Sequence, residues 1–205
     1  QTDRTFLEIE EIHKIQHLKL RARNPLYDAR EVFLFECYTG IRISDILTLK
    51  WKHITDEKIS IRMRKTEKLL SIPINDYVRA VLDRRRCAVE NNGGKITSEK
   101  YVFNILKVDV DEVSAQDALN AISSATAVIN KQLKKIAKKT GIDKNLSTHC
   151  ARHSYATALL TNNIPLPVIK EMLGHSDIKV TQIYAKVVDS KRNEVVECLN
   201  KVYHG

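Results

Sequence analysis

Only one part of this chain alternates between apolar and polar residues, and that pattern limits the choice of fold. The alternating positions form two runs, Ile59–Met63 and Leu70–Ile74, on either side of a charged segment at residues 64–68. A period of two is typical of half-buried strands, so the runs predict a β-hairpin with a charged tip. No strand–helix–strand series follows. We therefore expect an α+β fold, mainly α with a small antiparallel β-sheet.

Elsewhere the apolar residues recur at helical spacing, and capping residues mark the expected helix ends. Thr5 and Glu8 match a capping box, Gly40 and Gly141 match C-terminal stops, and Asn75 matches an N-cap. Tyr101–Phe103 predicts a short third strand, and 107–117 a polar loop. The expected helices are 5–20, 29–38, 44–50, 75–90, one over 122–136 that ends before Gly141, 148–160, 165–174, 176–184 and 189–201.

Composition narrows the class of protein. Hydrophobic residues make up 43% of the 205 residues, which is enough for a packed core, and no apolar run approaches the roughly 18 residues of a membrane span. The net charge of +9 favours a polyanionic partner, although a basic protein without such a partner is the alternative. Four scattered cysteines without a CxxC pair indicate reduced, intracellular thiols: Cys37, Cys87, Cys150 and Cys198.

Four short segments combine residues that carry chemistry. Arg42 follows a helix-ending glycine, and His149 and Arg152 share one helix face at positions i and i+3. His175 lies in a tight turn, and Tyr184 follows it by nine residues. The segments read TGIRISDI, HCARHSYAT, LGHS and TQIY.

Each of these residues also has an ordinary structural interpretation. An arginine after a helix is usually an ion-pair partner, and Asp45 lies three residues beyond Arg42. A histidine in a turn is usually a cap, and Tyr184 also fits a half-buried core position. A single motif is weak evidence of function, so the four segments must be interpreted together.

As a set, the segments resemble the tyrosine recombinases, also called the phage integrase family, from Phe6 to the C-terminal helix. Residues 91–120 depart from that pattern as an insertion, and the family's separate N-terminal core-binding domain has no counterpart in these residues. We therefore expect a single catalytic domain over 1–205. Because the chain opens at Gln1, we expect a fragment of a longer protein. The resemblance implies these site residues: Arg42, Lys65, His149, Arg152, His175 and Tyr184.

The resemblance implies site-specific DNA cleavage and rejoining through a 3′-phosphotyrosyl intermediate, with no cofactor and no metal. Tyr184 is then the nucleophile. Arg42 and Arg152 hold the non-bridging phosphate oxygens, a task that suits a planar guanidinium with a permanent charge. His149 and His175 add hydrogen bonds to the phosphate.

Proton transfer is the second task that the resemblance assigns. His149 is expected to accept the tyrosine proton, and Lys65 at the hairpin tip to protonate the departing 5′ oxygen, as a general acid does. Lys68 lies three residues further on and is the alternative to Lys65.

Three rival interpretations remain at this stage. His149 and His153, at i and i+4, match two zinc ligands, but a third ligand with suitable spacing is missing. A DNA-binding module without catalysis explains the charge, but it does not explain Tyr184. A type IB topoisomerase shares the chemistry, whereas LGHS favours a recombinase.

The expected partner is double-stranded DNA with specific recombination sites, and no membrane is involved. The resemblance implies a homotetramer on paired sites, a monomer in free solution, and a bacterial, cytoplasmic, DNA-associated protein. An apolar stripe on the terminal helix fits docking into a neighbouring protomer, with packing on its own domain as the alternative. The stripe is formed by Val188, Val195, Leu199 and Val202.

Overall fold

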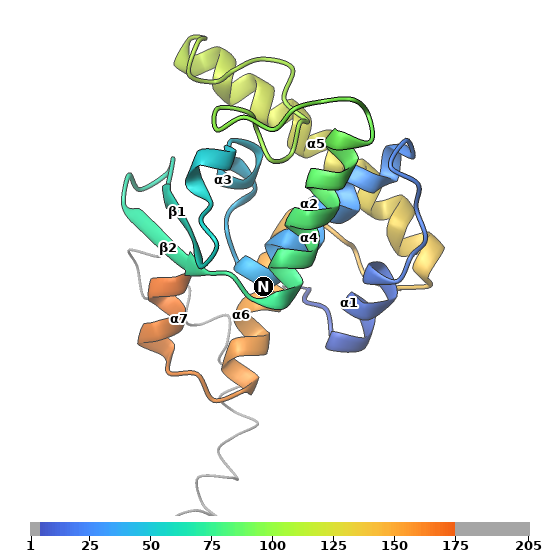
Figure 1. The fold of residues 1–205 in the computed structure, drawn as a ribbon. Helices are drawn as coiled ribbons and strands as arrows, with labels where there is room; N and C mark the ends of the chain where they lie inside the picture. The colour runs from blue at the N-terminus through green and yellow to red at the C-terminus, as the bar shows by residue number, and fades with distance from the viewer. Residues whose placement is uncertain (1–4, 175–205) are drawn as a thin grey trace, which may run out of the picture.

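The computed structural model describes residues 5–174, and Figure 1 shows how their elements are arranged. Helices dominate, and among these residues none is both long and apolar enough to cross a membrane. The elements in chain order are α1 (Ile9–Gln16), α2 (Pro25–Thr39), α3 (Ile43–Leu47), the 3-10 turn η1 (Trp51–His53), β1 (Lys58–Arg62), β2 (Leu69–Pro73), α4 (Asp76–Glu90), α5 (Ala115–Thr140), α6 (Thr148–Thr161) and α7 (Leu166–Met172).

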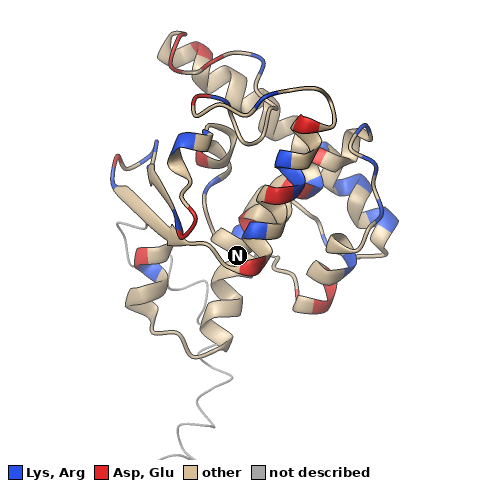
Figure 2. Ribbon diagram, viewed as in Figure 1, with Lys and Arg blue, Asp and Glu red and all other residues tan. Residues whose placement is uncertain are grey.

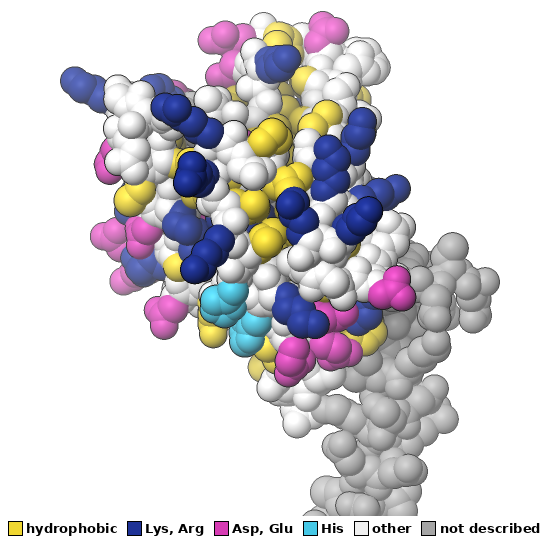
Figure 3. Space-filling view, turned by 90° about the vertical axis from the view of Figure 1, so that its right-hand side faces the viewer, with side chains coloured by type: hydrophobic (Ala, Val, Ile, Leu, Met, Phe, Trp, Pro, Cys, Tyr) yellow, Lys and Arg dark blue, Asp and Glu magenta, His cyan; other side chains and the backbone are white. Residues whose placement is uncertain are grey.

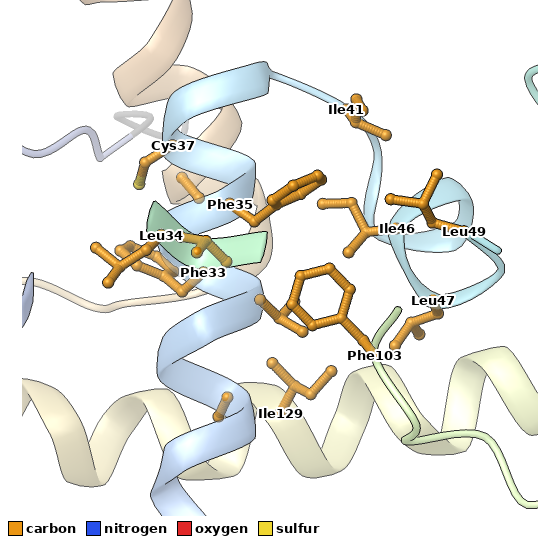
Figure 4. Close-up of a cluster of buried hydrophobic side chains, with 14 of the residues drawn as sticks. Phe33, Leu34, Phe35, Cys37, Ile41, Ile46, Leu47, Leu49, Phe103 and Ile129 are labelled. Atoms are coloured by element: carbon orange, nitrogen blue, oxygen red, sulfur yellow. The ribbon is translucent and has the colours of Figure 1, made fainter. Parts of the chain in front are cut away.

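Helix α2 forms the centre of the core. The Asn24 side chain caps it by accepting the Leu26 N–H, and Pro25 suits the first turn because a proline there loses no helical hydrogen bond. The helix is buried on nearly every side, and α1, α4, α5 and α6 pack around it. Figure 4 shows Phe35 meeting Phe103 edge to face, with ring centroids 5.2 Å apart.

The predicted hairpin is present. Strands β1 and β2 pair antiparallel, with Ile59 opposite Ile72 and Ile61 opposite Leu70 on the buried face. The Asn75 side chain then accepts the Val78 N–H at 2.9 Å and starts α4, as the sequence predicts. Helix α7 packs against β2, and it lies beneath the hairpin in Figure 1.

The first helix begins later than its capping box predicts. Glu8 is the N-cap of α1, and the Glu11 side chain accepts the Glu8 N–H at 2.9 Å, so the reciprocal cap lies one turn beyond Thr5. Leu7 is buried and its N–H donates to Ser154, which holds this segment in a non-helical conformation. The helix also ends at Gln16, before the predicted Leu20.

Further boundaries also differ from the expectation. Helix α2 begins at Pro25 instead of residue 29, and α3 ends at Leu47 instead of residue 50. Helix α3 starts at Ile43 with Arg42 as its N-cap, not Ser44. Residues 101–103 form no strand, because Tyr101 makes only an isolated bridge to Lys50. Ser114 caps α5 by accepting the Asp117 N–H, so the end of the predicted polar loop is the first turn of a 26-residue helix.

Gly40 ends α2 in a left-handed conformation, with φ at +65°, and it lies directly against α6. An added Cβ there would clash with the Tyr155 ring and lie 3.0 Å from Leu173 Cδ2. Gly141 ends α5 with a similar φ of +64°, but nothing lies within 4 Å of its Cβ position. The two glycines therefore share a backbone requirement, and only Gly40 has a packing requirement as well.

We expect Gly40→Ala to destabilise the fold more than Gly141→Ala does. Both variants force a β-carbon into the left-handed region, which costs about 1 kcal/mol. Gly40→Ala adds overpacking, typically ~1–3 kcal/mol. Urea titrations of both variants measure the two free energies of unfolding, and equal losses would contradict the packing argument.

Candidate active site

Arg152 connects three helix ends. Ser147 caps α6 by accepting the Cys150 N–H, and this places Arg152 on the second turn of the helix. The half-buried guanidinium donates to the Gly40 carbonyl at the end of α2 and, at 2.6 Å, to the Leu173 carbonyl beyond α7. These bonds fix the plane of the guanidinium and bring α2, α6 and α7 to one point.

Arg42 lies two residues beyond Gly40 and is therefore close to the same point. It is the N-cap of α3 and is half-buried. Its Nη1 contacts the Sδ of Met63, a buried residue at the end of β1, at 3.4 Å. Gly174 packs closely on the same thioether, so a β-carbon there would require the end of the Met63 side chain to shift. The hairpin, Arg42 and the residue before His175 therefore meet around Met63.

Asp45 is the acid that organises this region. Its Oδ1 accepts the Arg64 N–H at 2.9 Å, which attaches the start of the hairpin tip to α3. Burial raises the pKa of Asp45, while that bond and the charges of Arg42, Arg152 and Arg64 pull the pKa down. The sequence interpretation treated Asp45 only as an ion-pair partner of Arg42, and it did not foresee the bond to the hairpin.

The hairpin tip is an ordered turn that presents Lys65. Glu67 adopts a φ of +56°, its N–H donates to the Met63 carbonyl at 2.8 Å, and Met63 donates to the Lys68 carbonyl at 3.0 Å. Lys65 and Lys68 are both exposed. Exposure therefore does not distinguish Lys65 from Lys68.

His149 is exposed on the first turn of α6, one helical turn before Arg152 and on the same side of the helix. Its helix partner in the zinc hypothesis, His153, is half-buried. Within residues 5–174, no three His, Cys, Asp or Glu side chains form a group that could hold a metal ion.

The other two predicted site residues, His175 and Tyr184, lie outside the described residues. So do the predicted helices over 176–184 and 189–201 and the apolar stripe of the terminal segment. The structure thus brings together Arg42, Arg152 and the hairpin, and it places His149 on the same helix as Arg152.

A cavity of about 200 Å³ adjoins the hairpin, between η1 and the loop before α5. One wall carries Lys50, whose Nζ binds Asp109 at 3.1 Å and Asp111 at 2.7 Å. These ion pairs raise the pKa of the buried lysine and tie the acidic loop to η1. The other walls include basic side chains next to the proposed site, namely Lys52, Arg62 and Arg64.

Not all of the basic side chains lie near Arg42 and Arg152. The fully buried Glu31 accepts from the buried Arg30 and the half-buried Arg84, each at 2.9 Å, so the charges of these two arginines are paired within the fold. Figure 2 shows that Lys and Arg positions occur on the hairpin, α4 and α5 alike. Figure 3 shows another face, where Lys and Arg border a strip of apolar side chains. Net charge alone therefore does not identify a DNA-binding face.

Comparison with known proteins decides the family. The model of the Phage integrase family matches residues 5–191, which is most of the chain. The chain belongs to the phage integrase family. Its mainly helical fold with a two-stranded antiparallel sheet is the one found in the catalytic domains of tyrosine recombinases.

Relatives in this family include tyrosine recombinase XerD of Listeria monocytogenes, which is 48% identical over 160 residues. That match covers 77% of the present chain and 49% of XerD. The chain spans about half the length of the curated relatives that it matches over most of its residues.

Two solved structures share the fold. The XerH site-specific recombinase bound to palindromic difH, a post-cleavage complex, gives a TM-score of 0.66 at 22% identity, over 97% of this chain and 53% of XerH. A lambda integrase tetramer bound to a Holliday junction gives 0.58 at 20% identity, over 90% of this chain and 48% of the integrase.

Glu36 is another buried acid that sequence reasoning missed, although an acid inside the apolar run FLFECY was a visible signal. It lies on α2, one turn before Gly40, and is 1% exposed. Its Oε2 has no hydrogen-bond partner among residues 5–174. Burial raises the pKa of Glu36 well above its ordinary 4.5, against the opposing charge of Arg152.

This raised pKa makes stability depend on pH. Between 4.5 and the higher pKa of the folded state, the native protein binds more protons than the unfolded chain does, so stability falls as pH rises. Glutamine has the same shape and does not titrate. We expect Glu36→Gln to be more stable than wild type at neutral pH, with a gap that widens by up to about 1.4 kcal/mol per pH unit across this window.

Thermal and denaturant unfolding at pH 5, 7 and 9 measures the gap. Glu31→Gln is the matched control, because Glu31 is equally buried but is bound by Arg30 and Arg84, so its loss should destabilise the protein. A Glu36→Gln gap that stays constant or shrinks with rising pH would refute the assignment.

Proposed function

We propose that this chain is the catalytic domain of a site-specific DNA recombinase that cuts and rejoins strands through a 3′-phosphotyrosyl intermediate. The observation that carries the proposal is the convergence of Arg42 and Arg152 beside the hairpin, on a fold and in a family that fit this chemistry. Two positioned guanidinium groups suit a pentavalent phosphorane-like transition state, whose non-bridging oxygens carry negative charge.

In the proposed reaction, the Tyr184 oxygen attacks phosphorus, and the bond from phosphorus to the 5′ oxygen breaks. The energy of the phosphodiester is kept in the phosphotyrosyl ester, which a new 5′ hydroxyl then attacks in the reverse sense. Arg42 and Arg152 bind the phosphate oxygens, and His149 and His175 add hydrogen bonds to them. None of these steps requires a cofactor.

Two protons must move in each cleavage. The tyrosine hydroxyl, with an ordinary pKa near 10, must lose its proton, and His149 is the proposed acceptor. The departing 5′ oxygen must gain one, and Lys65 is the proposed donor. The ordered turn between Met63 and Lys68 supports this role, because it holds Lys65 on an exposed tip attached to α3 through Asp45.

The proposed partner is double-stranded DNA with specific recombination sites, and the proposed assembly is a homotetramer on paired sites. The XerH and lambda integrase complexes, bound respectively to difH and to a Holliday junction, support both parts of this proposal. In that assembly the terminal helix docks on a neighbouring protomer. We propose residues 1–205 as one catalytic domain of a bacterial, cytoplasmic protein.

A type IB topoisomerase is the nearest alternative, and the recombinases among the relatives do not favour it. Joining strands between two different duplexes is the discriminating activity. A topoisomerase relaxes a supercoiled plasmid without exchanging strands between partners.

We expect Tyr184→Phe to abolish cleavage and to leave DNA affinity within about twofold, because only the hydroxyl takes part in the chemistry. A nicked suicide substrate traps the covalent protein–DNA adduct, which a denaturing gel resolves. Tyr77→Phe is the matched control, since Tyr77 is exposed and its ring packs at a tilt against that of Tyr38. An unchanged adduct yield in Tyr184→Phe would exclude Tyr184 as the nucleophile.

A DNA substrate with sulfur in place of the departing 5′ oxygen tests which lysine, Lys65 or Lys68, donates the proton. A 5′-bridging thiolate leaves without protonation, because thiols are far more acidic than alcohols. We expect Lys65→Ala to slow cleavage of ordinary DNA by about 10²-fold or more, and to cleave the sulfur substrate at nearly the wild-type rate.

Lys68→Ala is the matched variant and should show neither the large loss nor the rescue. If Lys68→Ala shows both instead, the general acid is Lys68. If sulfur rescues neither variant, the hairpin tip does not supply the proton.

A further inference from the structure

The segment Thr5–Glu8, called here the entry segment, contacts α6, the helix that carries Arg152. Leu7 is 4% exposed and belongs to the main core. Its N–H donates to the Oγ of Ser154 on α6 at 2.8 Å, in a buried bond that joins residues 147 positions apart. A buried main-chain N–H requires a partner, so this bond fixes where the entry segment lies.

The position of the Ser154 side chain is fixed by burial and by two hydrogen bonds. It is 1% exposed, it accepts from Leu7, and its hydroxyl donates to the Cys150 carbonyl at 2.8 Å within α6. Two residues along a helix correspond to about 200°, so Ser154 and Arg152 project from opposite sides of α6. One side of the helix is attached to the entry segment, and the other is attached to Gly40 and Leu173 through Arg152.

A second link joins the same two regions. Lys144, in the loop before α6, binds Glu11 of α1 at 2.6 Å. Its ammonium also lies 5.7 Å from the centre of the Phe6 ring, within the range of a cation–π contact. The start of the chain thus contacts both the approach to α6 and the buried side of that helix.

We propose that Ser154 is a positioning residue, through which the entry segment sets the rotation and height of α6 and hence the place of the Arg152 guanidinium. This inference rests on the proposed function, because it assigns Arg152 a catalytic role. Small displacements matter in such a site, since a shift of about 1 Å can cost 10²-fold in rate.

The kinetic test compares Ser154→Ala with wild type in single-turnover cleavage of a suicide substrate at saturating DNA. We expect cleavage to slow about tenfold and DNA affinity to change less than about twofold. Lys144→Ala removes the second link at a more exposed position, and we expect it to slow cleavage by a smaller factor. Thr126→Ala is the control, because Thr126 makes the same kind of hydroxyl bond, to the Ile122 carbonyl, within α5.

A readout that does not need activity is the Arg152 side chain itself. In ¹⁵N NMR spectra, Ser154→Ala should shift the Arg152 Nη–H signals and speed their hydrogen exchange, because these groups bind the Gly40 and Leu173 carbonyls, whereas Thr126→Ala should do neither. The Leu7 amide should lose its protection from exchange in Ser154→Ala as well. These signals show whether α6 has moved, even if the variant is also less stable.

The outcomes separate the two proposals. If wild type forms no adduct with DNA, the proposed function fails, and the Arg152 signal still reports whether Ser154 positions that side chain. If wild type cleaves and Ser154→Ala cleaves as fast with an unchanged Arg152 signal, the positioning role is wrong. If affinity and cleavage fall together while the Arg152 signal stays unchanged, Ser154 has only a structural role.

Discussion

The bonds from the Arg152 guanidinium to two main-chain carbonyls hold the proposed site together. Carbonyls at helix ends lack helical partners, and a guanidinium is well suited to satisfy them. Here it takes the Gly40 carbonyl after α2 and the Leu173 carbonyl after α7. One side chain thereby joins the centre of the core, the helix that carries His149 and the segment that leads to His175. Folding and the proposed chemistry use the same group.

Acids buried near these arginines serve different purposes. Glu31 is neutralised by Arg30 and Arg84 and belongs to the packing of α2 against α4. Asp45 lies among three arginines and holds the hairpin by a main-chain bond. Glu36 has only the charge of Arg152 opposing the cost of its burial, so it favours the neutral form. The negative charge of the buried acids is thus either paired with arginine or reduced by protonation.

Much of the fold was predictable because its signals are local. The alternation in 59–74 gave the hairpin, Asn75 gave the start of α4, and Gly40 and Gly141 gave two helix ends. The start of α1 was not predictable in this way, because two overlapping glutamate patterns compete as caps. The bond between Leu7 and Ser154, which spans most of the chain, favours the later one. In the site, family patterns indicated Arg42 and Arg152, whereas their partners lie far away in sequence and leave no local trace.

The two halves of the proposed site differ in stiffness. Arg152 is bonded to two backbone carbonyls, at the ends of α2 and α7, so its position is tied to the main chain. The hairpin meets Arg42 and Gly174 through the Met63 thioether, on a side chain with three rotatable bonds and a soft, polarisable sulfur. A methionine side chain can change its rotamer slightly and still keep such contacts. Small shifts of the hairpin relative to Arg42 and Gly174 can therefore be absorbed by rotation of the Met63 side chain, while the bond from the Arg64 N–H to Asp45 keeps the start of the tip on α3.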